Sequence, residues 1–125
     1  MTTERGARRQ AESAGRLAET ATAALLLLHG LRPLARRLRT PLGEIDLIAR
    51  RGKLLVFVEV KLRRRQEDAA EAVTMRARKR TVAAARWWLA KHPAFARYTI
   101  RFDVVLWTPW SRPRHIVNAF DAGPF

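Results

Sequence analysis

Two carboxylates and one amine lie on two short segments whose residue types predict neighbouring β-strands. Asp46 lies in a segment where acidic and apolar residues alternate, while Glu59 and Lys61 end a strongly apolar segment. The Arg51-Gly52 pair between the two segments is typical of a hairpin turn. Residues two apart on a strand share a face, so Glu59 and Lys61 point the same way. Counting outward from the turn places Asp46 beside them, which predicts an acidic pair and an ammonium group at one edge of a sheet.

Metal-assisted hydrolysis of a phosphodiester is the chemistry that this group of residues suits. Carboxylate oxygens are hard ligands for Mg²⁺ or Mn²⁺, and such a metal stabilises charge on phosphorus and activates a water molecule. Asp46 and Glu59 are therefore the candidate metal ligands. Lys61 is the candidate for orienting the water or offsetting the charge of the phosphate. The alternative interpretation of the three residues is a salt-bridge set at the end of a strand.

The net charge of +14, with a sequence pI near 11.8, predicts an anionic partner. We expect nucleic acid, and DNA rather than RNA; a membrane surface is less well supported, because the first predicted helix carries acidic as well as basic residues. The residues expected to contact phosphates are Arg63, Arg64, Arg65, Arg76, Arg78, Lys79 and Arg80. A solvated charged face is the alternative interpretation of these runs. The chain has no cysteine, which excludes disulfides and thiolate catalysis.

Hydrophobic periodicity predicts a single domain over 1–125, with a loose end at 1–8. The expected helices cover about 9–28 and 69–90, and the expected strands cover 34–40, 44–49, 54–61, 99–107 and 115–120. The prediction is an α/β protein of order α-β-β-β-α-β-β, with a sheet flanked by two helices. The third expected strand is placed at the centre of the sheet because it begins with five apolar residues. No apolar run is long enough to span a bilayer, so the expected location is the cytoplasm.

Apolar residues at three- and four-residue steps predict the buried face of each helix. In the first helix they are Ala14, Leu17, Ala18, Ala21, Leu25 and Leu28. In the second helix they are Met75, Val82, Ala85 and Leu89. Trp88 is expected in the core, while Trp107 and Trp110 are expected to cover an edge of the sheet. Asp103 is expected to be a structural partner of an arginine such as Arg101.

A resemblance to a known family rests on two motifs, GEIDLIA at 43–49 and VFVEVK at 56–61. Together they resemble the signature of the YraN-like family of small bacterial proteins, and the resemblance extends from about Arg16 to Phe120. It implies the restriction-endonuclease-like fold, also called PD-(D/E)XK, with a central mixed sheet. Within that fold, the resemblance places the family near the archaeal Holliday-junction resolvases.

The resemblance also implies roles for individual residues. Asp46 matches the metal-binding aspartate of the fold, Glu59 matches the acid of its D/E-x-K element, and Lys61 matches the lysine that positions the water. The backbone carbonyl of Val60 is implied as a further metal ligand, and Glu19 as the acid carried by the first helix. The implied activity is a Mg²⁺- or Mn²⁺-dependent endonuclease acting on branched or otherwise structured DNA. A homodimer fits such an activity, because paired cuts need paired sites.

Four positions depart from the pattern of the family. Gln66 and Glu67 replace a usual Phe-Gly pair, Ala77 replaces a usual lysine, and Arg37 replaces a usual asparagine. These departures are compatible with an alternative function, a basic nucleic-acid-binding module of the same fold without catalysis. A basic accessory protein that binds RNA or the ribosome is a further alternative.

Overall fold

A mixed sheet of five strands packs against two α-helices in the part of the chain that the structure describes. The computed structural model describes residues 4–64 and 75–121. Its elements are α1 (Glu4–Leu28), β1 (Arg32–Thr40), β2 (Gly43–Arg51), β3 (Leu54–Leu62), α3 (Met75–Lys91), the short 3-10 helix η2 (Pro93–Phe95), β4 (Thr99–Trp107) and β5 (Arg114–Ile116). The prediction of an α/β protein with a sheet and helices is confirmed.

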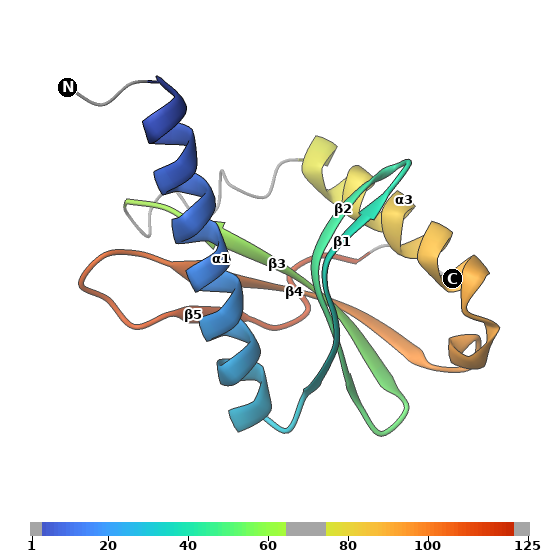
Figure 1. Cartoon of the computed structure of the whole chain (residues 1–125). Helices are drawn as coiled ribbons and strands as arrows, with labels where there is room; N and C mark the ends of the chain where they lie inside the picture. The colour runs from blue at the N-terminus through green and yellow to red at the C-terminus, as the bar shows by residue number, and fades with distance from the viewer. Residues whose placement is uncertain (1–3, 65–74, 122–125) are drawn as a thin grey trace.

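The strands follow one another across the sheet in the order β1-β2-β3-β4-β5 (Figure 1). The pairs β1–β2, β2–β3 and β4–β5 are antiparallel, whereas β3 and β4 are parallel. A parallel pair needs a crossover connection, and α3 lies in the one between β3 and β4. The central position predicted for β3 is confirmed, and its residues Leu55 to Val58 are buried.

Each helix covers one face of the sheet. Alternate residues of β3 divide between two apolar clusters, with Leu55 and Phe57 packed on the side of α3 and Val56 and Val58 on the side of α1. Leu26 is the fully buried anchor of α1 in its cluster. Because both faces of β3 are covered, its apolar run is stabilised by burial throughout.

The buried face of α1 agrees with the predicted one only in part. Ala18 is buried and Leu25 packs partly buried against the core, as predicted. The other buried side chains are Thr22 and Leu26, whereas Leu17 is 71% exposed and Leu28 is 83% exposed. Thr22 is tolerated in the core because its hydroxyl donates to the carbonyl of Ala18 at 2.6 Å and accepts from Trp107 Nε1 at 2.8 Å. The helix also begins at Glu4, inside the stretch predicted as a loose end.

The buried face of α3 consists of Thr81, Ala84, Ala85 and Trp88. The predictions for Ala85 and Trp88 are confirmed, but Met75 is 66% exposed and is no part of the core. The segment 69–74 of the predicted helix lies outside the described residues. Val82 and Leu89 are partly buried and pack against the same core, so among the residues predicted for this face only Met75 is wrong.

Two predictions about the end of the chain are corrected. Trp110 does not cover the sheet, because its side chain is fully exposed at 104%. The last strand covers Arg114–Ile116 rather than 115–120. It ends early because Asn118 adopts a left-handed conformation with φ +52° and its N–H donates to Asp103 Oδ1 at 3.0 Å.

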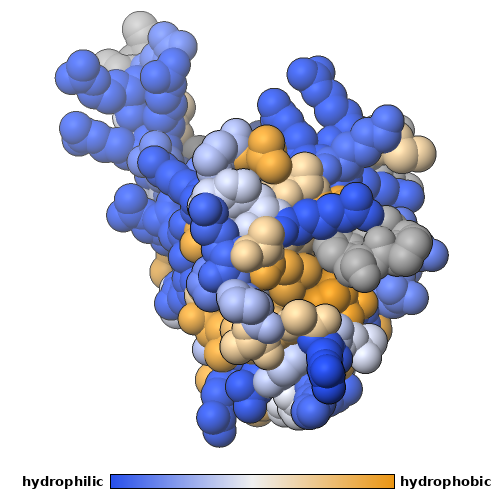
Figure 2. Space-filling view, turned by 90° about the vertical axis from the view of Figure 1, so that its right-hand side faces the viewer, coloured by the Kyte–Doolittle hydropathy of each residue, from blue (hydrophilic) through white to orange (hydrophobic). Residues whose placement is uncertain are grey.

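The visible surface in Figure 2 is largely hydrophilic, with hydrophobic side chains gathered near its centre. Within residues 4–64 and 75–121, no helix is both long and apolar enough to cross a membrane.

Candidate functional site

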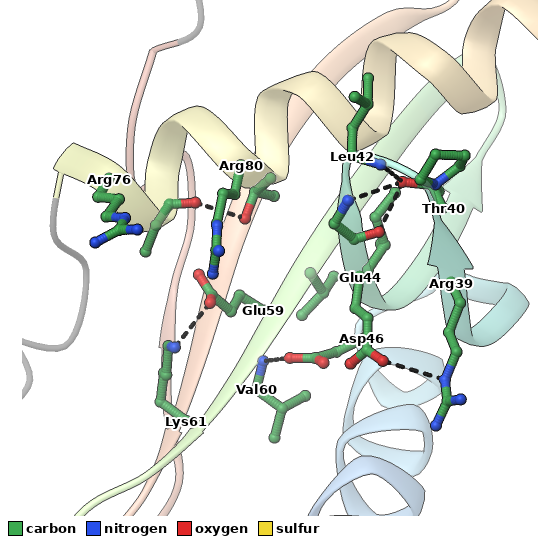
Figure 3. A pocket seen from close by; sticks show the side chains of 16 residues that line it. Arg39, Thr40, Leu42, Glu44, Asp46, Glu59, Val60, Lys61, Arg76 and Arg80 are labelled. Carbon is green, nitrogen blue, oxygen red and sulfur yellow. Dashed lines mark hydrogen bonds and ion pairs between the residues drawn. The ribbon is translucent and has the colours of Figure 1, made fainter.

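The candidate site forms where the ladder between β2 and β3 ends. The last pair of that ladder is Leu47 with Val58. One residue further, the carboxylate of Asp46 accepts the backbone N–H of Val60 at 2.8 Å through Oδ2 (Figure 3). The Asp46 side chain thus replaces the backbone carbonyl that would accept from Val60 in a continuous ladder. This hydrogen bond holds the Asp46 carboxylate at the point where the two strands separate.

Glu59 and Lys61 occupy the same face of β3, as their spacing predicts. Their side chains form an ion pair of 2.8 Å between Lys61 Nζ and Glu59 Oε1 (Figure 3). The Glu59 side chain is 16% exposed and the Lys61 side chain is 20% exposed, so the pair is only partly open to solvent. Partial burial strengthens this electrostatic contact relative to a pair on the open surface.

The carboxyl group of Asp46 lies in an environment that disfavours its negative charge. Burial, together with the negative charges of Glu59 and Glu19, raises its pKa from the usual 3.8 to about 6. The hydrogen bond from Val60 and the positive charge of Lys61 oppose this shift of the pKa but do not cancel it. A cation bound to Asp46 would therefore offset the repulsion from these neighbouring negative charges.

A divalent cation fits the donor atoms that the site offers. Oε2 of Glu59 is buried, and no described residue forms a hydrogen bond to it. Such an oxygen lacks the partner that buried carboxylates normally have. Asp46 and Glu59 are hard oxygen donors, which Mg²⁺ prefers, and Mg²⁺ retains several of its waters. Among the described residues no group of three or more His, Asp or Glu side chains is placed to hold a metal, so the fit rests on this pair of carboxylates.

Basic side chains border the pocket into which these acids open. The pocket has a volume of about 800 Å³, and Arg39 of β1 and Arg76 and Arg80 of α3 contribute to its lining. Figure 3 shows Arg80 reaching down from α3 toward Glu59. The pocket thus combines metal-binding types of side chain at its base with phosphate-binding types at its rim.

The turn between β1 and β2 forms one wall of the pocket, and its residues were not predicted as part of the site. Thr40 Oγ1 accepts the N–H groups of Leu42 and Gly43, at 3.2 Å and 3.1 Å. Gly43 has φ +153°, and a Cβ there would lie 3.3 Å from the carbonyl oxygen of Arg80. Pro41 and Gly43 are residue types that favour a turn, whereas the contact of this turn with α3 depends on tertiary packing.

Glu19 lies beside the site rather than in the pocket lining. Its carboxylate forms an ion pair of 3.2 Å with Arg37 Nε, and its side chain is 12% exposed. Arg37 adopts a left-handed conformation with φ +51°. Glu19 still acts on Asp46 through its charge, which contributes to the raised pKa of that group. Val60 lines the pocket, and its N–H is the partner of Asp46.

The predicted phosphate-binding residues divide among several surfaces. Arg76 and Arg80 line the main pocket, together with Ala77. Arg63 and Arg64 border a second pocket at the end of β3. The other two of these residues on α3 lie outside the main pocket. The guanidinium group of Arg78 lies 5.6 Å from the ring centre of Phe120, and Lys79 lines a neighbouring groove. The positions outside the described residues are Arg65, Gln66 and Glu67.

Asp103 forms a separate polar cluster on β4. Its carboxylate accepts from Arg101 at 2.9 Å and 2.8 Å and contacts His115 Nε2 at 2.7 Å. Burial alone would raise the pKa of Asp103, but these contacts and the N–H of Asn118 together lower it. The prediction that Asp103 is a structural partner of Arg101 is confirmed.

The described residues define a mixed α/β protein whose sheet presents two carboxylates and a lysine to a pocket bordered by arginines. The chain belongs to the uncharacterised protein family UPF0102, whose sequence profile matches residues 18–107. The resemblance to the YraN-like family is thereby confirmed.

Relatives of this chain occur in several bacteria, each named a UPF0102 protein. The one from Rhodopseudomonas palustris strain BisB18 is 55% identical over 107 residues, covering 86% of this chain and 79% of the relative. The relative from Bradyrhizobium diazoefficiens is 53% identical over 105 residues, with coverages of 84% and 79%. The relative from Nitrobacter winogradskyi is 52% identical over 109 residues, with coverages of 87% and 92%.

Proposed function

We propose that the protein is a metal-dependent nuclease that hydrolyses phosphodiesters in nucleic acid. The observation that carries the proposal is the meeting of Asp46, Glu59 and Lys61 at the base of one arginine-bordered pocket. The proposal includes the restriction-endonuclease-like fold, which the resemblance of the two sequence motifs implies. In that fold the catalytic centre consists of an acidic residue on one strand and of an acidic residue and a lysine on the next strand.

Asp46 and Glu59 are the residues that would hold Mg²⁺ or Mn²⁺, with the backbone carbonyl of Val60 as a further ligand. The bound ion would neutralise charge on the phosphate and lower the pKa of a water molecule. The hydrogen bond from Val60 N–H keeps the Asp46 carboxylate in one orientation before any ligand arrives. This preorganisation avoids reorienting the carboxylate during the reaction.

Lys61 has two tasks in the proposed reaction. Its ammonium group donates to Glu59 Oε1 at 2.8 Å, which holds Nζ beside the acid. An ammonium group has three N–H donors, so hydrogen bonds to the attacking water or to a phosphate oxygen are available alongside this contact. Lys61 would therefore orient the water and offset the negative charge that develops on the phosphate.

Arginine side chains would bind the phosphates on either side of the scissile bond. Arg39, Arg76 and Arg80 border the pocket, and Arg63 and Arg64 lie beyond the end of β3. The net charge of +14 attracts a polyanion to this surface without selecting a sequence. We expect DNA in a branched or otherwise structured form, because the resemblance implies it.

A cleavage assay tests the proposal. Labelled four-way junctions, flaps, single strands, duplexes and RNA are incubated with Mg²⁺ or Mn²⁺, and with EDTA. Wild type is compared with Asp46→Asn and Lys61→Ala, and matched binding assays are run on each. The control variants are Glu12→Gln on the exposed part of α1 and Lys53→Ala in the β2–β3 turn, since both residues are exposed and away from the pocket.

The expected result is metal-dependent cleavage by wild type and by both controls, with loss of cleavage but not of binding in Asp46→Asn and Lys61→Ala. Binding by wild type without cleavage of any substrate would contradict the nuclease proposal. That outcome would favour the non-catalytic nucleic-acid-binding module instead.

A further inference from the structure

Trp110 is the largest apolar side chain that the fold leaves in solvent. It is 104% exposed, and its backbone has φ +64°. A bulky residue in this left-handed region is unfavourable, and an exposed indole forgoes the hydrophobic gain of burial. Neither feature contributes to folding, and strained residues of this kind concentrate where a protein contacts a ligand.

The loop that carries Trp110 is anchored at both ends. Val105 pairs with His115 and Leu106 pairs with Arg114 at the base of the β4–β5 connection. Pro109 precedes Trp110, and Pro113 closes the loop, and each proline ring restricts its own backbone. The indole is therefore presented from a constrained loop.

The surroundings of Trp110 in the sequence are basic. Arg112 and Arg114 are exposed, and residues 104–120 contain no acidic side chain. Exposed arginines beside an exposed aromatic ring are the combination that nucleic-acid-binding surfaces use. The arginines contact phosphates, and the ring contacts a base.

The register of the sheet places this loop beside the candidate site. Lys61 pairs with Leu106 in the parallel β3–β4 ladder, and the N–H of Arg63 donates to the carbonyl of Trp107 at 3.0 Å. Figure 1 shows the β4–β5 connection and the C-terminal end of β3 at the same end of the sheet. Trp110 is four residues beyond Leu106, which corresponds to at most about 14 Å of chain. The spacing between β3 and β4 adds about 5 Å between Lys61 and Leu106, and stacked nucleotides advance about 3.4 Å each, so a strand crossing Lys61 reaches Trp110 within about six nucleotides.

We propose that Trp110 stacks on an unpaired base of the nucleic acid whose backbone crosses the candidate site. The substrate class is therefore a nucleic acid with a single-stranded segment within a few nucleotides of the scissile phosphate. Bases inside an intact duplex are already stacked on their neighbours, whereas an unpaired base exposes a face to the indole. This inference rests on the proposed function, because it places the strand over Asp46, Glu59 and Lys61.

Tryptophan fluorescence tests the inference without relying on cleavage. The chain has four tryptophans; Trp88 is 6% exposed, and Trp87 and Trp107 are partly buried, so Trp110 is the fully exposed fluorophore. The titrants are a single-stranded oligothymidylate, a blunt duplex and a duplex with a single-stranded tail. EDTA is present in every titration, which prevents metal-dependent cleavage of the oligonucleotides.

The expected result is stronger quenching by the single strand and the tailed duplex than by the blunt duplex. Trp110→Ala should weaken binding of the tailed duplex by about 5- to 150-fold, the range for loss of one stacked base. Trp110→Phe should retain most of the affinity and lose most of the quenching, because phenylalanine stacks on a base but does not contribute to the tryptophan fluorescence. Trp87→Phe is the matched control and should change neither property; circular dichroism checks the fold of each variant.

Equal affinity of wild type and Trp110→Ala for the tailed duplex would overturn the inference and leave the proposed nuclease standing. Failure of wild type to bind any of the oligonucleotides at low salt would overturn both. Quenching by anionic phosphatidylglycerol vesicles but not by any oligonucleotide would also overturn the inference, in favour of a membrane contact.

Discussion

The carboxylate of Asp46 accepts the backbone N–H of Val60 at 2.8 Å, across the gap where β2 and β3 separate. The main chain of the strand that carries Glu59 and Lys61 therefore holds the acid of the neighbouring strand. A displacement of either strand would alter the relation between the two acids. The geometry of the candidate site is thus tied to the register of a hairpin, which the pairing of Leu47 with Val58 determines.

Replacing Asp46 by asparagine is expected to stabilise the metal-free protein at neutral and alkaline pH. The pKa of Asp46 is raised from 3.8 to about 6 in the folded protein, so the folded state binds a proton more tightly than the unfolded state. The favourable contribution of the protonated group is complete below about pH 4 and is lost as the pH rises through about 6.

Asp46→Asn keeps an oxygen that accepts from Val60 N–H, and we expect a gain of about 1–3 kcal/mol near pH 8. Urea denaturation of wild type and variant in EDTA, near pH 8 and near pH 4, measures the effect. A gain of equal size at both pH values would show that the charge of Asp46 is not its cause.

Millimolar Mg²⁺ is expected to raise the free energy of unfolding of the wild-type protein. An ion that binds the folded state and not the unfolded state stabilises it in proportion to the logarithm of the ion concentration above its Kd. Asp46→Asn and Glu59→Gln should each abolish most of this increase, because each removes one of two carboxylate ligands. Glu12→Gln, on the exposed part of α1, should retain it. An equal response in all four proteins would argue against a metal at this pair.

Replacing Asp103 by asparagine is expected to destabilise the protein by about 3 kcal/mol near pH 7, because it leaves the buried partners of a charged group unpaired. Contacts with His115, Arg101 and Asn118 outweigh burial and lower the pKa of Asp103. Its ionised form therefore contributes stability above the unfolded pKa of about 4, and this contribution is lost as the pH falls through the lower folded pKa. Denaturation midpoints near pH 7 and below pH 3 should show a penalty that shrinks in acid.

Gly43→Ala is expected to destabilise the protein by about 1–2 kcal/mol, since it places a Cβ at an unfavourable backbone conformation. The new Cβ would also lie 3.3 Å from the carbonyl oxygen of Arg80, which displaces the turn from α3. Gly15→Ala is the matched control, because nothing lies within 4 Å of a Cβ there and alanine favours a helix. Thermal denaturation should move in opposite directions for the two variants.

Arg76→Gln combined with Arg80→Gln is expected to weaken DNA binding similarly for all sequences. Each lost phosphate contact should reduce the slope of log affinity against log salt by about 0.7–0.9. Titrations over a range of salt concentrations measure this slope. Arg97→Gln, an exposed arginine after η2, provides the control and should leave the slope unchanged. An unchanged slope in the double variant would place the phosphates elsewhere on the protein.

Much of the hairpin could be predicted from the sequence. The alternation around Asp46, the apolar run before Glu59 and the glycine turn at Gly52 are local signals, and a period of two residues determines which side chains share a face. The ion pair between Glu59 and Lys61 follows from this period. The buried face of α1 was harder to predict from the sequence, because alanine and leucine lie on several sides of this helix. Packing against the sheet buries Thr22 and leaves Leu17 and Leu28 exposed.

The sequence by itself determined the residues available for chemistry, their strands and the strong positive charge. Only the tertiary structure decided that Asp46 accepts from Val60, that Gly43 lies against α3 and that Trp110 stands free of the sheet. The physical reason is the range of the interactions involved. Alternation and turn propensity act between neighbours in the chain, whereas burial and hydrogen-bond partners depend on residues that meet only after the elements have packed.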